Sequence, residues 1–320
     1  MKIELAELKM AVLLSFGIFF LFTPSQSWYL QLQTEFRPAQ VHALEFPLPL
    51  PAHVPLQSDN TPPPNLSAES VVVLDVGSGM FLHRQNENAS LLPASTVKMM
   101  TALVVLDYFP PDQILTVGAL NSWGQQLKLV EGEQLTVTDL LYALLVSSAN
   151  DAAEVFTQAY PGGEPAFVRA MNDKARRFHL NNTFFANATG LDSDPDLRPL
   201  PQRSRSSAVN LATLGGLALK NSLIRQIVST PSKQISDLTG KYHHQLVNIN
   251  LLLQRPDFKG IKTGWTEEAG ECLVAYAQKE NHAIITVVMG SRNRFQDTEK
   301  LVDWVWGSFV WQPLAPSLSY

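Results

Sequence analysis

Nine of the 21 prolines of this 320-residue chain fall between Pro24 and Ser67, and this concentration limits where the chain can fold. Proline lacks a backbone N–H and fixes one backbone dihedral, so a dense run favours extended polyproline geometry over helix or sheet. We therefore expect residues 28–67 to form a semi-rigid linker. The cooperative fold is then expected at residues 68–320, a length that can bury a sizeable core.

An apolar run at residues 10–23 precedes this linker and follows Lys2 and Lys9. It has the length of a signal-peptide core and falls short of the roughly 20 apolar residues that a transmembrane helix needs. Residues 1–27 are therefore predicted to direct export. The pattern leaves open whether this segment is a cleaved signal peptide or a retained N-terminal membrane anchor.

Charge and cysteine content narrow the function classes. The formal net charge is −5, and no block rich in lysine or arginine occurs, so we expect no nucleic-acid partner. The single cysteine, Cys272, cannot form an intrachain disulfide. It lies in an apolar run, which is typical of a small buried residue, so we interpret it as a packing residue.

Strand patterns at both ends of the expected fold enclose a series of helical patterns. The sheet of an α/β (α+β) domain is therefore predicted to be built from both ends, with an all-helical subdomain inserted between them. The first hairpin joins 71–75 to 80–82, and the last joins 271–278 to 283–289. Helices are expected at 93–108, 135–160 with a break near 147–151, 165–178, 208–219, 223–228 and 295–309.

The first candidate motif is Ser95-Thr96-Val97-Lys98, at the start of a helix. Positions i and i+3 share one helix face, so the Lys98 amine can reach the Ser95 hydroxyl. A serine needs a base to become a nucleophile at neutral pH, and a lysine can act as that base once burial or a second cation lowers its pKa. Helix N-terminal N–H groups beside Ser95 would also face developing negative charge.

Two further motifs follow in order. Ser148-Ala149-Asn150 lies at the break between two expected helices, where serine and asparagine also serve as ordinary caps. Lys262-Thr263-Gly264 is expected to open an edge strand beside the site, with a glycine that permits close backbone approach to a ligand. We expect Lys262 to help lower the pKa of Lys98 and to attract a carboxylate.

These three motifs in this order resemble the active-site-serine penicillin-binding proteins and serine β-lactamases. The flanking sequence is similar to the low-molecular-weight D-alanyl-D-alanine carboxypeptidases, across about residues 67–309. The matching stretches are 72–75, 93–102, 144–153, 185–187, 190–192 and 260–264. The resemblance implies an antiparallel sheet flanked by helices with an inserted helical subdomain, the β-lactamase/transpeptidase-like fold.

By this resemblance the chain is a serine-type carboxypeptidase that removes the terminal D-alanine of peptidoglycan stem peptides through an acyl-enzyme on Ser95, with no cofactor or metal. It implies β-lactams as covalent inhibitors and a location in the periplasm or at the outer face of the cytoplasmic membrane. The backbone N–H groups of Ser95 and Trp265 would form the oxyanion hole. The implied catalytic residues are Ser95, Lys98, Ser148 and Asn150, and the implied substrate-binding residues are Lys262, Thr263, Gly264, Trp265, Thr266 and Arg294.

The chain also departs from the family pattern. Ala149 stands where glycine is frequent, and it should fit unless its φ is positive. The segment 192–205 is longer and more charged than usual, and nothing in the sequence gives it a role. The family's C-terminal β-domain and terminal anchor are not found, so we expect any membrane attachment at the N-terminus.

Three alternatives accompany this interpretation. A serine β-lactamase of class A needs a further glutamate, and the stretch between Asn150 and Lys262 offers only Glu154 and Glu164. A non-catalytic binder of wall peptides or penicillin would share the motifs. A zinc-dependent D,D-peptidase is disfavoured because the histidines lack metal-ligand spacing, and the pair His243-His244 is interpreted as a solvated loop.

Overall fold

The computed structural model describes residues 53–191 and 202–313. The predicted export segment, most of the predicted linker and most of the charged segment 192–205 lie outside these residues. Within the described part of the chain, no helix is both long enough and apolar enough to cross a bilayer.

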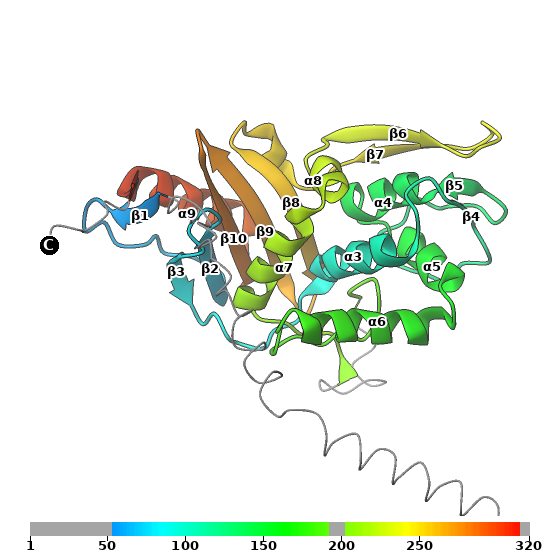
Figure 1. Ribbon diagram of the computed structural model, residues 1–320, viewed down its shortest axis with the longest axis horizontal. Coiled ribbons are helices and arrows are strands. Elements are labelled where there is room, and N and C mark those ends of the chain that lie inside the picture. The colour runs from blue at the N-terminus through cyan, green and yellow to red at the C-terminus, as the bar shows by residue number, and fades with distance from the viewer. Residues whose placement is uncertain (1–52, 192–201, 314–320) are drawn as a thin grey trace, which may run out of the picture. The chain divides into compact units, whose positions relative to one another are not determined.

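A five-stranded antiparallel sheet in the order β3-β2-β10-β9-β8 lies at the centre of the fold (Figure 1). Strand β2 comes from the beginning of the described chain and pairs with β10 from its end. The prediction of one sheet built from both ends is therefore confirmed. The strands are β2 (Ser70–Asp75), β3 (Phe81–Gln85), β8 (Phe258–Thr266), β9 (Gly270–Lys279) and β10 (His282–Ser291).

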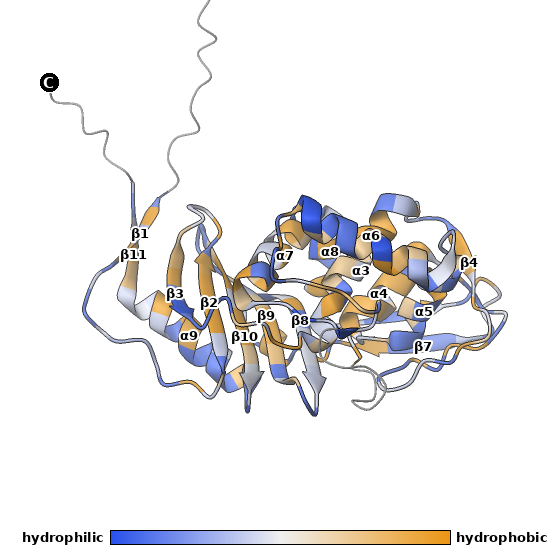
Figure 2. Cartoon of the chain, turned by 90° about the horizontal axis from the view of Figure 1, so that it is seen from below, coloured by the Kyte–Doolittle hydropathy of each residue, from blue (hydrophilic) through white to orange (hydrophobic). Residues whose placement is uncertain are grey.

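Both faces of the sheet are buried, and alternate residues of β2 show this. Val71 and Val73 belong to the core on the side of α9 (Arg294–Ser308), whereas Val72 belongs to the core on the opposite side. Side chains alternate along a strand, so a run of consecutive valines is expected where helices cover both faces. Figure 2 shows this as hydrophobic colouring along β2 and β10 and hydrophilic colouring over much of α6 (Gly163–Arg177) and α9.

The inserted segment is mostly helical, as predicted. Thr136 accepts the backbone N–H of Asp139 and caps the N-terminus of α4 (Val137–Val146). The break between α4 and α5 also lies where it was expected. The helices are η1 (Ala94–Val97), α3 (Lys98–Tyr108), α4 (Val137–Val146), α5 (Asn150–Ala159), α6 (Gly163–Arg177), α7 (Ala208–Lys220), α8 (Ser222–Val228) and η3 (Leu251–Gln254).

Three two-stranded ribbons were missed in the sequence. Their strands have only three to five residues each, too few for a periodic pattern to mark them. Their strands are β1 (Val54–Gln57) with β11 (Phe309–Gln312), β4 (Ile114–Thr116) with β5 (Gln134–Thr136), and β6 (Ser232–Ser236) with β7 (His243–Val247).

Two of these ribbons lie where the sequence predicted a linker or a loop. Strand β1 contains Pro55 and lies within the predicted linker, yet it pairs with β11; a proline is tolerated at the edge of such a ribbon. The interpretation of His243-His244 as a solvated loop is wrong. Both lie in β7, and His244 Nε2 lies 2.8 Å from a carboxylate oxygen of the buried Glu133.

Candidate active site

The first motif spans the junction of η1 and α3, which places its serine and lysine together. Lys98 Nζ lies 3.0 Å from Ser95 Oγ, the contact predicted from their spacing. The turn that presents Ser95 is strained, because Ala94 has a φ of +47°. Gly190 packs directly against it: a Cβ at Gly190 would lie 2.0 Å from the Ala94 carbonyl oxygen, so only glycine fits there.

The Lys98 amine is fully buried and has two further partners. Its Nζ lies 2.7 Å from Asn150 Oδ1 and 2.6 Å from the Thr189 carbonyl oxygen. Both of these oxygens are acceptors only. A neutral amine has two N–H bonds and one lone pair, so donation to these two acceptors leaves the lone pair for the Ser95 hydroxyl. This geometry suits an amine that accepts the serine proton.

Burial also changes the proton affinity of this amine. It lowers the pKa of Lys98 from its ordinary value of 10.5 to about 7, because the ammonium loses hydration, while the nearby Asp151 carboxylate acts in the opposite direction. A substantial fraction of Lys98 is therefore neutral at physiological pH. The sequence predicted this direction.

The second motif joins α4 to α5. Ser148 adopts a φ of +58°, and Ala149 has a φ of −61°, so alanine fits the middle position as expected. Asn150 begins α5, and its side chain is held by a second contact: its Nδ2 donates to the Trp123 carbonyl oxygen at 2.6 Å. Its backbone N–H donates to Gln125. The segment around Trp123 therefore fixes the carboxamide that holds Lys98.

The third motif lies inside β8, at the edge of the sheet. The edge position was predicted, but the motif occupies the second half of the strand instead of opening it. Lys262 Nζ donates to Ser148 Oγ at 2.9 Å and to the Thr263 carbonyl at 2.9 Å. A Cβ at Gly264 would lie 3.0 Å from Ser95 N, so the glycine permits close approach to η1 and brings β8 against Ser95.

The charge on Lys262 requires a correction. Burial lowers its pKa well below the ordinary value, and the positive charges of Lys98 and Arg294 lower it further. Burial, and not Lys262, is the main cause of the lowered pKa of Lys98. Two ammonium groups repel each other, so a second ammonium is disfavoured in this one buried space. A bound carboxylate would favour the second ammonium.

The remaining predicted substrate-binding residues differ in what their side chains contact. Arg294 Nη1 donates to the Gly264 carbonyl at 2.8 Å, so this arginine does lie beside the third motif. Thr263 Oγ1 and Arg294 Nε are buried and have no hydrogen-bond partner among the described residues. Trp265 is 61% exposed, whereas the Thr266 hydroxyl accepts the N–H of Ala269 in the β8–β9 turn.

Two contributors to the site were not identified from the sequence. The Thr189 carbonyl is a backbone group, so no side chain marks it in the sequence. Only the neighbouring Gly190 indicated that this loop approaches another segment. Asp151 follows the second motif, and its carboxylate accepts the backbone N–H groups of Leu127 and Leu129. It therefore holds the loop that supports Asn150.

The site brings together a serine hydroxyl, a buried amine with a lowered pKa, and a second serine–lysine pair. These groups match the requirements of nucleophilic acyl transfer, in which a base activates the serine and a second hydroxyl relays a proton.

Comparison with known proteins gives the same picture. The D-alanyl-D-alanine carboxypeptidase family, peptidase S11, matches residues 57–293. D-alanyl-D-alanine carboxypeptidase DacF of Bacillus subtilis is 32% identical over 258 residues, which cover 77% of this chain and 64% of the relative. A D-alanyl-D-alanine endopeptidase of Pseudomonas aeruginosa is 32% identical over 266 residues, which cover 80% of this chain and 81% of the relative.

Solved structures agree in fold. The Streptomyces K15 DD-transpeptidase superimposes with a TM-score of 0.69 at 26% identity and covers 77% of this chain and 100% of its own. A penicillin-binding protein homolog from Mycobacterium tuberculosis gives a TM-score of 0.69 at 27% identity and covers 83% of this chain and 99% of its own. The predicted transpeptidase-like fold is thus confirmed, and the chain belongs to the D-alanyl-D-alanine carboxypeptidase family, peptidase S11.

Proposed function

We propose that this protein is a serine-type D-alanyl-D-alanine carboxypeptidase that removes the terminal D-alanine of peptidoglycan stem peptides. The observation that supports this most directly is the buried Lys98 amine, which has one acceptor from Asn150, one from Thr189 and the Ser95 hydroxyl as its third neighbour. Because the chain spans 64% of the length of DacF, the activity is proposed for this chain and is not transferred from the relative.

In the acylation step, neutral Lys98 takes the Ser95 proton as Ser95 Oγ attacks the carbonyl carbon of the penultimate D-alanine. The backbone N–H groups of Ser95 and Trp265 stabilise the oxyanion. Loss of one such donor costs about 3–4 kcal/mol in comparable sites. Ser148 passes its hydroxyl proton to the departing amine and takes a proton in turn from the Lys262 ammonium, which donates a hydrogen bond to it. D-alanine leaves. Water then cleaves the ester: Lys98 returns its proton to Ser95 Oγ, and the proton that the water gives up restores the Lys262 ammonium.

Recognition of the free C-terminal carboxylate of the peptide would favour removal of its last residue, which is a carboxypeptidase reaction. Lys262, Thr263 and Arg294 bind this carboxylate in the proposal, and each has a property that suits the task. Burial lowers the pKa of Lys262, and an anion beside it would favour its ammonium form; the Thr263 hydroxyl and Arg294 Nε have no hydrogen-bond partner among the described residues. A carboxylate beside these groups would restore the hydrogen bonds and charge that burial takes away.

The central experiment is D-alanine release from a peptide that ends in Lys-D-Ala-D-Ala, with penicillin labelling measured in parallel. Ser95→Ala should abolish both signals. Ser229→Ala, at the C-terminus of α8, is the matched control and should retain both. Labelling that persisted in Ser95→Ala would refute the nucleophile assignment, and rapid turnover of nitrocefin would favour a β-lactamase.

An endopeptidase reaction is a second candidate for the same site. The endopeptidases of Pseudomonas aeruginosa and Escherichia coli match 81% and 83% of their own lengths, more than the 64% of DacF. Incubation with a crosslinked muropeptide dimer and with an uncrosslinked pentapeptide separates the two. Faster cleavage of the dimer would identify an endopeptidase.

Export is part of the proposal, because the proposed substrate and β-lactams are met outside the cytoplasm. It is supported by the apolar run at residues 10–23, which follows two lysines. Cell fractionation, combined with mass spectrometry of the mature N-terminus, tests export and distinguishes a cleaved signal peptide from a membrane anchor. Recovery of the full-length chain in the cytoplasm would contradict it.

A further inference from the structure

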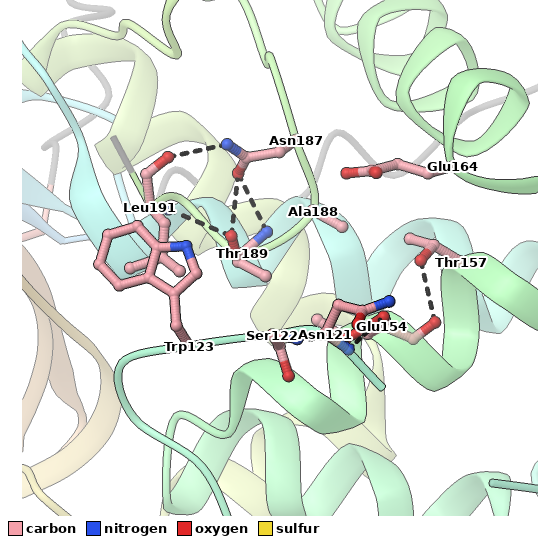
Figure 3. Close-up of a pocket in the computed structure, with 11 residues that line it drawn as sticks. Asn121, Ser122, Trp123, Glu154, Thr157, Glu164, Asn187, Ala188, Thr189 and Leu191 are labelled. Carbon is pink, nitrogen blue, oxygen red and sulfur yellow. Dashed lines mark hydrogen bonds between the residues drawn. The ribbon is translucent and has the colours of Figure 1, made fainter. Parts of the chain in front are cut away.

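A cavity of about 520 Å³ lies between α7 and the sheet, away from the catalytic residues. The cavity beside Thr189 and Trp123 is a different one, which adjoins the active site and belongs to it (Figure 3). Figure 1 shows α7 and α9 on opposite sides of the sheet. Tyr276, which lines the larger cavity, lies farther along β9 than Cys272, the residue that pairs with Gly264 of the third motif. At roughly 3.3 Å per residue, Tyr276 and Cys272 are about 13 Å apart, so the two cavities are separate.

The wall of this cavity is mostly apolar. Gly216 of α7 leaves room in it, because a Cβ at this position would lie 3.6 Å from Ile285 Cδ1, an ordinary contact distance. The volume falls within the range of about 300–1,000 Å³ that is typical of small-molecule sites. The large apolar side chains that line it come from both strands and helix: Leu74, Phe81, Leu217, Leu219 and Ile285. This wall suits the hydrocarbon part of a small ligand.

Three hydrogen-bond donors also line the cavity: Lys220 at the end of α7, Arg225 of α8, and Tyr276. Arg225 Nη1 donates to the Leu219 carbonyl at 3.3 Å, which holds the guanidinium beside the end of α7. Neither cation forms a salt bridge within the part of the chain that the structure describes. Burial raises the pKa of Tyr276, while the positive charge of Arg225 acts in the opposite direction, so the two groups lie close together.

One carboxylate lines the cavity as well, and its oxygens are already engaged. Asp75 is buried, and its Oδ2 accepts the backbone N–H of Ser78 at 2.7 Å and the Ser78 hydroxyl at 2.6 Å. Its Oδ1 accepts the indole N–H of Trp311 at 2.8 Å. Two cations therefore face one carboxylate that has other partners, and the lining keeps a net positive charge.

We propose that this cavity binds a molecule with one aliphatic chain and one carboxylate, that is, a free fatty acid. The chain would pack against the apolar wall, and the carboxylate would accept charge-assisted hydrogen bonds from Arg225 and Lys220 and a further one from the Tyr276 hydroxyl. A neutral lipid would leave both cations without a partner. The volume suits one chain better than the two chains of a membrane phospholipid.

Calorimetric titration of the full-length protein with three probes tests the two parts of this ligand separately. Decanoate should bind with one site per chain. Hexanoate should bind at least ten times more weakly, because it buries fewer methylene groups. Decanol keeps the chain but lacks the carboxylate, so its affinity should be about ten times lower than that of decanoate, as for charge-assisted hydrogen bonds at a partly exposed site.

The head-group contacts are tested by removing both cations. Lys220→Gln/Arg225→Gln should weaken decanoate binding about tenfold and leave decanol binding unchanged. Arg169→Gln/Arg177→Gln removes the same charge from exposed positions of α6 and should change neither. Equal decanoate affinity in the wild-type protein and in Lys220→Gln/Arg225→Gln would overturn the site, and so would an equal loss in the α6 variant.

The apolar wall is tested by filling the cavity. Gly216→Leu should weaken decanoate and decanol alike by at least tenfold. Gly307→Leu, in α9, is the matched control, because a Cβ there would meet no atom within 4 Å, and both affinities should be kept. Thermal unfolding of the free variants shows whether each one folds; if Gly216→Leu does not, the cation variants still decide the question. Unchanged decanoate binding in folded Gly216→Leu would overturn the site.

The apolar run at residues 10–23 could take up fatty acid as well, so each comparison is made between variants of the same full-length chain. Vesicles of phosphatidylglycerol distinguish a membrane lipid from a free fatty acid. Vesicle binding that depends on Lys220 and Arg225, with no binding of decanoate, would overturn the proposed ligand. D-alanine release enters none of these measurements, so their outcome is independent of the proposed function.

Discussion

The lowered pKa of Lys98 leads to a quantitative expectation for the pH dependence of acylation. Only neutral Lys98 can accept the Ser95 proton. With a pKa of about 7, the neutral fraction is about 0.1 at pH 6 and about 0.9 at pH 8. The rate constant for acylation by penicillin should therefore rise about tenfold between these values and level off above them. A lysine at the ordinary pKa of 10.5 would be about 0.0003 neutral at pH 7, over 1,000-fold less.

Single-turnover measurements with a fluorescent penicillin isolate this step from deacylation. Two variants test whether Lys98 is the group whose titration sets the pH dependence. Asp151→Asn removes the carboxylate that raises the pKa of Lys98, so the rise should move to lower pH. Lys262→Arg replaces the other buried amine with a group that does not titrate in this range, and the rise should remain near pH 7. A flat profile from pH 6 to 8, or a rise that moves to higher pH in Asp151→Asn, would refute the assignment of Lys98 as the base.

Three further expectations concern packing and capping. Gly190→Ala places a Cβ 2.0 Å from the Ala94 carbonyl at a φ of +77°, so thermal stability and penicillin labelling should both fall; an unchanged Tm would contradict the packing described. Thr136→Ala removes the cap that accepts the Asp139 N–H and should cost about 1 kcal/mol in urea unfolding, whereas no loss would show that the cap is dispensable. Cys272 is fully buried, so a thiol reagent should label it only after denaturation, and rapid labelling of the native protein would contradict that burial.

Much of the site was readable from the sequence because its side chains carry strong local signals. The spacing of Ser95 and Lys98 places them on one helical turn, and the position of Asn150 at a helix break was visible in the surrounding pattern. The β-branched run of β2 likewise marked a strand of a hairpin. These features depend on side chains that are close in sequence.

The parts that were missed depend on contacts between distant segments. The Thr189 carbonyl has no side-chain signature, and its role follows only from how the loop before Gly190 meets η1. Burial and a second cation were both expected to lower the pKa of Lys98, and only the assembled core shows that burial is the main cause. The ribbon of β6 with β7 carries few apolar residues, so tertiary pairing and not local preference decides it.

The position of β2 between β3 and β10 has a consequence for when the site can form during synthesis of the chain. A nascent polypeptide that ends before residue 258 would already contain Ser95, Ser148 and Lys98, but β2 would lack its neighbour β10, and β8, which lies against Ser95, would be missing. Lys262 and the rest of β8 belong to the last fifth of the chain, so we expect competence for acylation only once that part has emerged. A partly synthesised molecule offers neither the substrate nor an antibiotic a working target.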